Sequence, residues 1–578
     1  MHLSHVKVYN FKSIQELDIS LGRYNPVVGY NNAGKSNFLR AISWLLKKSA
    51  LPESCFHDPS KEAWVEGTVV GVSSAIHLLP ENQQQQIEPF IISDQLTFRR
   101  IQKTPGTTAS LVKLEVLDGS GNWRANPTGI DNALGTMLPE PVHIKAMDDA
   151  GDDVSKFAAK NTIGLLIKYA LDLARANNQS AMQTVDASLA ALGTHLNGQT
   201  RIPELTSLES SATQSLASLF SGIDVQIEIP PPSLDEIIKS TTIKLVEQGS
   251  NNPRAFADYG HGTQRTVQMA LIQLLAKYAS QVGSAGNNTV ILIDEPELYL
   301  HPQAICSVAA ALKDLSSGDF QIFFSTHSPM MVGADDAAET VVFWKCPQRG
   351  TTYRQKIASA LSGISNSQHQ TDVIYSLSHS SQWLFSEKPI IVEGKTERHL
   401  LPAVYFGATG KRLNQASASL IESAGSGGSI DIAKLFKNLG YTPKVVFDLD
   451  FAFKEAPSLN LISPADPNLN SCLQWFAANS SSLGFNLDCT GLPRKGGAMN
   501  PEKAYEQLAI ALPTECRNIH NLFKPINIWL WPGGAIEAHL GIAKTNAARA
   551  QFAALAMAGG GVSHAADPQT LLDFSNWI

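Results

Sequence analysis

The hydrophobic pattern of the first 150 positions predicts strands joined by short turns. Residues 3–30 contain two short strands around residues 10–13 and a third at residues 26–28, which leads into a glycine-rich turn. Between residues 62 and 145, short runs alternate apolar and polar side chains, as strands with one buried face do. This region is therefore expected to form an antiparallel layer, with the polar run at residues 83–86 as an exposed loop.

Further along the chain the pattern changes twice. Residues 150–225 are rich in Ala, Leu and Ser and are expected to be helical. Apolar runs at residues 289–295 and 320–327 end in polar residues, which is typical of the central strands of a covered sheet. Residues 346–385 are expected to be a connector, and a second α/β pattern begins at residue 389.

Composition and charge exclude some classes of protein. Hydrophobic residues make up 43% and charged residues 17% of the 578 positions, as in a globular protein with a large core. The formal charge of −7 does not indicate a basic nucleic-acid binder, although basic patches or bound metal can hold phosphate on an acidic protein. The six cysteines form no C-x-x-C pair, which argues against a zinc ribbon and a disulfide framework. Because the N-terminus is strand-like and no apolar stretch approaches about 18 residues, we expect a reduced, soluble, cytoplasmic protein.

The turn at residues 29–36 matches the phosphate-binding pattern G-x-x-x-x-G-K-S, and residues 37–46 place apolar side chains at helical spacing after it. In such a P-loop, backbone N–H groups approach the phosphates, a lysine reaches the β- and γ-phosphates, and a hydroxyl ligates Mg²⁺. A purely structural glycine turn is the alternative. The residues expected to bind ATP here are Asn31, Asn32, Gly34, Lys35, Ser36 and Asn37.

Further candidate ATPase residues follow the later strands. Asp294 and Glu295 end an apolar strand as a Walker B pair does, the first to hold Mg²⁺ through water and the second to orient or deprotonate the attacking water. His327 ends the next strand, where it is placed to sense the γ-phosphate, although a structural histidine is the alternative. Gly262 and Gln264 belong to a segment that opens an amphipathic helix, whose backbone amides could hold a phosphate bound on a second subunit.

Four carboxylates follow hydrophobic strands in the second half of the chain. Glu393 comes at the end of one strand, and Glu397 lies one helical turn further on, so both can face one site. Asp448 and Asp450 end another strand, and strand alternation puts them on one side. Four convergent carboxylates cannot all stay ionised without cations, which argues for Mg²⁺ or Mn²⁺. The alternatives are a simple turn at Glu393 and a solvated strand end at Asp448.

The order of the ATPase motifs resembles the ABC-type ATPases of the RecF, SMC and OLD group. The resemblance rests on the P-loop, Gly-x-Gly-x-Gln-Arg at residues 260–265, Asp-Glu-Pro-Glu from Asp294, and Ser-Thr-His-Ser-Pro around His327. In that group ATP is sandwiched between two heads, so the resemblance implies at least a homodimer. The serine that often begins the helix-opening motif is Tyr259 or Gly260 here, which departs from the group's pattern.

The four acids together resemble a Toprim domain, the metal-binding fold of topoisomerases, primases and OLD-family nucleases. Residues 425–428 are similar to the small-residue loop of OLD-type domains, with a flexible turn as the alternative. By the same resemblance Glu537 joins a second metal, the alternative being a first-turn helix acid. Lys544 is the expected catalytic lysine, with Lys395 and Lys495 as other candidates, whereas the stretch 543–566 is otherwise expected to be peripheral.

An ABC-type ATPase followed by Toprim is the layout of OLD-family nucleases. The expected fold is α/β: a P-loop ATPase domain with a helical dimerisation insert, followed by a Rossmann-like Toprim nuclease domain. The expected bounds are 1–149 and 226–345 for the split ATPase domain, 150–225 for the insert, 346–385 for the connector and 386–578 for the Toprim domain.

The resemblance implies an ATP-regulated, metal-dependent DNA endonuclease. Its expected cofactors are ATP and two Mg²⁺ ions, or Mn²⁺, and its expected partners are DNA and further copies of itself as a homodimer or homotetramer. Similarity to Gabija-type nuclease subunits and OLD-like retron effectors implies anti-phage defence, with a helicase or reverse-transcriptase partner. The alternative is an ATP-switched DNA-binding or scaffolding protein with a non-catalytic Toprim domain. A topoisomerase needs a nucleophilic tyrosine in a separate DNA-binding domain, and a primase commonly carries a zinc-binding module. Both are disfavoured because no such module is recognisable, and a pure ATPase leaves residues 386–578 unexplained.

Overall fold

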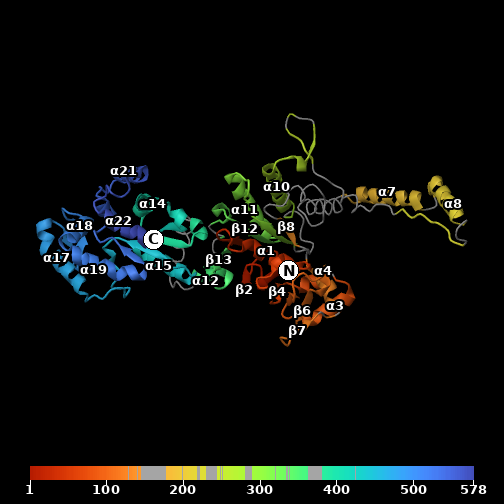
Figure 1. Cartoon of the computed structure of the whole chain (residues 1–578), viewed down its shortest axis with the longest axis horizontal. Coiled ribbons are helices and arrows are strands. Elements are labelled where there is room, and N and C mark those ends of the chain that lie inside the picture. Colours follow the sequence, from red (N-terminus) through yellow and green to blue (C-terminus); the bar gives the residue numbers. More distant parts are fainter. Residues whose placement is uncertain are drawn as a thin grey trace. The chain divides into compact units, whose positions relative to one another are not determined.

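The computed structural model describes residues 1–77, 79–125, 127, 129–138, 141–144, 178–197, 200–217, 222–229, 244–247, 249, 252–279, 289–318, 320–333, 336, 339–361, 381–423 and 425–578. By compactness the chain divides into two units, whose elements are labelled in Figure 1. The first comprises Met1–Asn25, Gly34–Met331 and Cys346–Thr351, and the second comprises Pro26–Ala33, Val332–Lys345 and Thr352–Ile578. No helix among these described residues is long and apolar enough to cross a membrane.

A 12-stranded sheet has the order β7-β6-β5-β4-β1-β2-β14-β13-β3-β12-β11-β8. Its antiparallel part confirms the layer predicted from alternating side chains, and in β4 every second residue is buried. The strands of this part are β1 (His2–Phe11), β2 (Ile14–Ser20), β4 (Ala63–Val70), β5 (Gln95–Gln102), β6 (Lys113–Leu117) and β7 (Trp123–Ala125).

The parallel strands of the same sheet carry continuous apolar runs, as predicted for covered strands. All six residues of β12 and five of the six in β11 are buried, and the two strands pair in parallel. Buried side chains of α10 and α11, such as Met269 and Leu312, share a core with Ile322 and Phe324 of β12. The elements are β3 (Tyr24–Val28), β8 (Val142–Ile144), β11 (Thr289–Asp294), β12 (Phe320–Ser325), β13 (Val341–Cys346), α1 (Lys35–Leu46), α10 (His261–Ala279) and α11 (Pro302–Ser316).

Two local predictions are wrong. The polar run at residues 83–86 lies inside α3 (Glu81–Ile87) and not in a loop, because Ile87 is fully buried and the helix packs on α4 (Ile130–Met137). The expected connector begins with a strand, β14 (Gly350–Arg354), whose Gly350 pairs with Ile14. The connector also contains α12 (Ile357–Leu361), and its residues 362–380 lie outside the described residues.

The expected helical insert is described in part. It contains α7 (Gln179–Asn197) and α8 (Pro203–Ala217), both largely exposed, whereas residues 150–177 lie outside the described residues. The remaining short elements of the first unit are α2 (Ser73–Ile76), β9 (Lys244–Leu245) and β10 (Arg254–Ala255).

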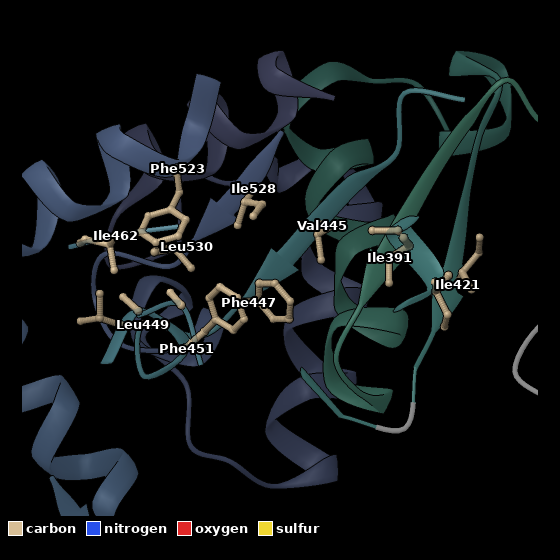
Figure 2. Close-up of a cluster of buried hydrophobic side chains, with 14 of the residues drawn as sticks. Ile391, Ile421, Val445, Phe447, Leu449, Phe451, Ile462, Phe523, Ile528 and Leu530 are labelled. Carbon is tan, nitrogen blue, oxygen red and sulfur yellow. The ribbon is translucent and has the colours of Figure 1, made fainter. Parts of the chain in front are cut away.

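The second unit is built on a four-stranded parallel sheet with the order β16-β15-β17-β20. Helices cover both faces, so neighbouring residues of one strand belong to different cores: Ile391 of β15 lies in the cluster drawn in Figure 2, and Val392 lies in another. Phe447, at the end of β17, stacks on Phe451 with ring centroids 3.9 Å apart. This packing holds the chain immediately after β17 in place.

The bounds of the second unit's elements complete the fold. The sheet strands are β15 (Lys388–Val392), β16 (Ala418–Glu422), β17 (Lys444–Phe447) and β20 (Ile528–Leu530), and a small hairpin contains β18 (Asn486–Leu487) and β19 (Pro493–Arg494). The helices are α14 (Lys395–Thr409), α15 (Ser426–Asn438), α16 (Phe451–Lys454), α17 (Pro467–Leu483), α18 (Pro501–Ala511), α19 (Pro513–Phe523), α20 (Ile536–Leu540), α21 (Asn546–Leu555) and α22 (Pro568–Trp577).

Candidate nucleotide site and acidic centre

The P-loop turn ends where α1 begins. Gly34 has φ 103°, in the left-handed region that favours glycine, and a Cβ there would lie 2.1 Å from Thr351 Oγ1. Asn37 Nδ2 and Thr351 Oγ1 both donate to Ser13 Oγ at 2.7 Å. The start of α1 is therefore held by β14, within the stretch that the sequence suggested was a connector.

The predicted Walker B aspartate lies at the end of β11 and is 3% exposed. Ser325 Oγ donates to Asp294 Oδ1 at 2.8 Å, and His143 Nε2 lies 3.4 Å from Asp294 Oδ2. Burial alone would raise the pKa of Asp294, but hydrogen bonds from His143, Ser36 and Ser325 hold it below its usual value. The contact with Ser36 brings the P-loop and the Walker B strand together.

Lys35, Glu295 and His327 also meet at this edge of the sheet. Lys35 Nζ lies 2.9 Å from His327 Nε2, and the same imidazole nitrogen lies 3.3 Å from Glu295 Oε1. Burial lowers the pKa of Lys35 to about 8 and, with the nearby lysine, that of His327 to about 4. Burial, followed by the charge of Glu297, raises the pKa of Glu295. At neutral pH the imidazole is therefore uncharged beside a charged lysine.

The other predicted nucleotide residues differ in their surroundings. Asn31 and Asn32 are exposed in the turn before Gly34. Gly262 and Gln264 lie on the first turn of α10, where the buried Gln264 side chain donates to the carbonyl of Tyr259 at 2.8 Å. That amide supports the turn before the helix.

Three supporting residues were not singled out from the sequence. Arg265 donates to the backbone oxygens of Asp294 at 2.8 Å and Glu295 at 3.0 Å, and so ties α10 to the Walker B strand. Glu297 Oε1 accepts the backbone N–H of His327 at 2.7 Å. Arg265 and Glu297 stand within the recognised motifs, so spacing could have found them, whereas His143 lies on β8 without a local signal.

In the second unit, parallel strands deliver the predicted carboxylates to one edge. Glu393 follows β15, and Glu397 is buried in the first turn of α14. β17 ends at Phe447, so the turn after the strand, and not strand alternation, orients Asp448 and Asp450. Because β15 and β17 pair in parallel, the residues after both strands meet at the carboxyl edge of the sheet.

The charges of these four acids perturb one another. Burial, with Asp450 and then Glu397 as the nearest charges, raises the pKa of Glu393 to about 7. Burial also raises the pKa of Glu397, and burial together with Glu397 and Asp450 raises that of Asp448 well above its usual range. Asp448 Oδ1 is buried without a hydrogen-bond partner among the described residues. The Asp448 carboxyl therefore has an unsatisfied buried acceptor, next to acids whose charges raise its pKa.

Basic side chains hold the outer acids. Lys454 Nζ donates to Asp450 Oδ2 at 2.7 Å, and Arg549 Nη2 donates to Glu537 Oε1 at 2.8 Å. Lys544 Nζ lies 3.9 Å from Glu537 Oε2; burial would lower its pKa, but Glu537 and nearby acids raise it. The prediction that residues 543–566 are peripheral is thus wrong, because two basic side chains of this stretch face the acids. Lys454 and Arg549 were missed because no motif marks them.

The cluster fits divalent cations by its chemistry. Its ligand atoms are all carboxylate oxygens, which Mg²⁺ and Mn²⁺ prefer, and a buried acceptor without a partner is the mark of an ion or water site. Within the described part of the chain, no three acidic, histidine or cysteine side chains are close enough to hold one ion as they stand. Asp450 and Glu537 form ion pairs with the basic side chains of Lys454 and Arg549 instead.

A buried histidine fixes the turn that leads to Glu537. The backbone N–H of Gly533 donates to His539 Nε2 at 2.8 Å, and His539 Nδ1 lies 2.9 Å from Asp567 Oδ2. The next residue, Gly534, accepts the N–H of Leu449 at 2.8 Å, between the two aspartates. The turn after β20 and the turn after β17 are therefore linked by backbone hydrogen bonding.

Three family profiles match the chain in the order of its domains. An AAA ATPase domain matches residues 1–100, and an AAA domain described as a putative AbiEii toxin of a type IV TA system matches residues 140–332. The TOPRIM domain of proteins like the overcoming-lysogenization-defect protein matches residues 384–450. The expected combination of an ATPase domain with a Toprim domain is confirmed.

Known relatives extend over most of the chain. The Old nuclease of Escherichia phage P2 is 35% identical over 562 residues, which cover 94% of each chain. The OLD nuclease of Thermus scotoductus is 24% identical over 404 residues, 68% of this chain and 72% of the relative. Endonuclease GajA of Bacillus cereus is 22% identical over 433 residues, 70% of this chain and 68% of the relative. A solved SMC head bound to the C-winged helix domain of ScpA matches 63% of this chain and all of its own, at 14% identity and a TM-score of 0.39.

The identity to the phage P2 protein spans nearly the whole length of both chains, and the profile matches lie at residues 1–100, 140–332 and 384–450. This chain belongs to the OLD nuclease family, as a nuclease that carries an ATPase domain and a TOPRIM domain.

Proposed function

We propose that this protein is a metal-dependent DNA endonuclease whose cutting is controlled by ATP. The observation that carries the proposal is the buried, unpartnered Oδ1 of Asp448, which stands among further carboxylates in a family of nucleases. The residues that would hold the metal are Glu393, Glu397, Asp448, Asp450 and Glu537. Two Mg²⁺ or Mn²⁺ ions bound there would stabilise the attacking and leaving oxygens of a phosphodiester.

The chain's own side chains have distinct roles in this proposal. Lys544 stays protonated beside Glu537 and Asp448, so it can neutralise charge that develops on the phosphate. Arg549 holds Glu537 in a fixed orientation through a 2.8 Å hydrogen bond. Loss of Lys544 should therefore lower the turnover rate, because its charge is needed most in the transition state.

ATP would bind in the first unit and control the nuclease. Lys35 would reach the β- and γ-phosphates, Ser36 and Asp294 would hold Mg²⁺, and Glu295 would orient the attacking water. The imidazole of His327, uncharged at neutral pH, can sense the γ-phosphate as a hydrogen-bond partner. Gly262 and Gln264 at the start of α10 would contact nucleotide bound to a second copy.

Self-association through the helical insert is part of the proposal. α7 and α8 expose the apolar side chains of Val185, Leu192 and Leu208, which are 39%, 40% and 55% exposed. A second copy would cover them, as an apolar face in water favours burial. Deletion of the insert, residues 150–225, is expected to reduce the number of copies per particle measured by light scattering, and an unchanged number of copies would refute this role.

The decisive assay is plasmid nicking with Mg²⁺ or Mn²⁺, with and without ATP. Asp448→Asn is expected to abolish nicking, whereas Glu515→Gln, on α19 outside the cluster, serves as the matched control for loss of one negative charge. Lys35→Ala is expected to change the response to ATP while metal-dependent cutting persists. Nicking that survives in Asp448→Asn would refute the assignment of the active centre.

The alternative function is an ATP-switched DNA-binding protein with a non-catalytic TOPRIM domain. It is favoured by the ion pairs in which Lys454 and Arg549 already neutralise Asp450 and Glu537. In that case wild-type protein would bind DNA and hydrolyse ATP, and no metal would produce nicks. The Asp448→Asn variant would then bind DNA as the wild type does.

We also propose an anti-phage role, which the resemblance to Gabija-type nuclease subunits and OLD-like retron effectors implies. Expression of wild type is expected to reduce phage plating, and expression of Asp448→Asn is not. Equal plating on both strains would contradict this role.

A further inference from the structure

A cavity of about 470 Å³ opens beside the acidic centre. Its volume falls in the range of ligand-binding pockets. Its lining combines two acids of the centre, Asp448 and Asp450, with basic side chains that include Arg494 and Lys495. Six of the lining residues carry the charges and the hydroxyl discussed below: Asp448, Asp450, Lys454, Arg494, Lys495 and Tyr505.

The backbone that carries the two outer basic residues is firmly held. Arg494 belongs to β19, which pairs with β18. A Cβ on Gly497 would lie 2.7 Å from Gly484 O, and Met499 N donates to that same oxygen at 2.9 Å. The segment then ends in Asn500, whose side chain caps α18. The exposed Arg494 and Lys495 side chains therefore extend from a turn that is fixed at both ends.

Tyr505 supplies an unsatisfied polar group in the same cavity. Its side chain is 3% exposed, and its hydroxyl has no hydrogen-bond partner among the described residues. The ring is locked by Phe476 and Phe453, with centroids 5.2 Å and 5.6 Å away. A buried hydroxyl without a partner is costly, so a ligand oxygen that accepts a hydrogen bond from it would be favoured.

We propose that this cavity binds the phosphate adjacent to the scissile phosphodiester of a DNA strand. Arg494 and Lys495 neutralise that phosphate, and the Tyr505 hydroxyl donates a hydrogen bond to one of its oxygens. The proposal rests on the proposed nuclease function, because the acids at the cavity's other side would hold the scissile bond. Polynucleotide is favoured over a small anion, because residues of the basic turn and acids of the centre line the same cavity.

The cavity also predicts how sequence-specific the contact is. Among the described lining residues Tyr505 has the sole aromatic ring, and this ring is buried against two phenylalanines. A base therefore has no exposed ring on which to stack, whereas the charged side chains contact the backbone of any sequence. Binding at this subsite should depend on salt and be indifferent to base identity.

The test measures binding separately from cutting. A fluorescein-labelled DNA duplex is titrated with full-length protein in Ca²⁺ in place of Mg²⁺ at several salt concentrations, and a gel verifies that the DNA is uncut. The double variant Arg494→Gln, Lys495→Gln is compared with Lys411→Gln, Arg412→Gln, an exposed basic pair on the turn after α14. Loss of one phosphate contact should reduce the slope of log K against log salt by about 0.9 in the first variant alone.

A second variant tests the hydroxyl. Tyr505→Phe keeps the ring and all charges, so it should weaken binding by about fivefold, equivalent to about 1 kcal/mol, without changing the salt slope. An unchanged slope in the first double variant, or an equal decrease in the control pair, would overturn the proposal. Failure of the nuclease function would show instead as wild-type protein that binds with the expected slope and never cuts in Mg²⁺ or Mn²⁺.

Discussion

Replacement of Glu393 by Gln tests whether the acidic centre is a cation site or only a set of structural ion pairs. Burial, followed by the charges of Asp450 and Glu397, raises the pKa of Glu393 from 4.5 to about 7. The folded state therefore holds this proton more firmly than the unfolded chain does. The resulting stabilisation is complete below about pH 4.5 and is lost as the pH rises through about 7.

The magnitude follows from the size of that shift. At about 1.4 kcal/mol per pKa unit, ionised Glu393 lowers the free energy of unfolding by about 3 kcal/mol. Gln cannot ionise, so in EDTA at about pH 8 the variant should be more stable than wild type by up to about 3 kcal/mol. At about pH 5 most of this advantage should disappear.

Saturating Mg²⁺ should reverse the sign of the difference in unfolding free energy between Glu393→Gln and the wild type. Mg²⁺ bound to the folded wild type stabilises it by mass action, by about 4.1 kcal/mol at a thousandfold excess over Kd, which exceeds the deficit of about 3 kcal/mol. Glu393→Gln lacks one ligand and should gain less. In saturating Mg²⁺ the wild type should therefore be the more stable protein.

Urea denaturation followed by tryptophan fluorescence measures these differences. Six of the nine tryptophans lie in the second unit, so the signal reports chiefly on the unit that contains the acids. Glu515→Gln, on α19 outside the cluster, is the control and should show neither effect. The reasoning would be refuted if Glu393→Gln were less stable than wild type in EDTA at about pH 8, or if the difference were equal at both pH values.

Three further predictions concern both units. Because Lys35 has a pKa of about 8, ATP affinity should be constant below about pH 8 and fall about tenfold per pH unit above it; calorimetry that finds no decline contradicts this. Arg549→Met should lower the free energy of unfolding by about 3 kcal/mol in EDTA, because it leaves the buried Glu537 without its partner. Mg²⁺ should restore part of this stability, and equal losses in urea denaturation with and without Mg²⁺ would count against a cation site. Gly34→Ala should abolish ATP binding, because a Cβ would collide with Thr351, while urea unfolding of the second unit stays unchanged; wild-type ATP affinity would contradict this.

Much of the fold and the candidate site could be predicted from local sequence. β11 and β12 are continuous apolar runs, and β15 and β17 end immediately before acids, so both the strands and the side chains at their ends are visible in the linear pattern. Parallel pairing then brings such ends together without further information. Motif spacing was sufficient to place Asp294 close to Ser36.

The features that escaped prediction depend on partners distant in sequence. α3 is polar over most of its length and is held as a helix by burial of Ile87 against α4. β14 forms a strand because Gly350 pairs with Ile14 and Thr351 bonds to Ser13, residues some 340 positions earlier in the chain. Arg549 is an ordinary residue of an alanine-rich helix until folding brings it to Glu537. The pattern of polar and apolar residues within a short segment does not indicate such long-range contacts.

The imidazole of His539 makes the acidic centre depend on a helix that contributes no ligand to it. Asp567 Oδ2 pairs with Nδ1 of His539, and Asp567 Oδ1 caps α22 by accepting the N–H of Thr570. Nε2 of His539 accepts the Gly533 N–H, so the ring proton is on Nδ1 and points to Asp567. The ring therefore links the turn before Glu537 to Asp567 in one tautomer only. Disturbing α22 should thus alter metal affinity from behind the site, with every carboxylate still in the sequence.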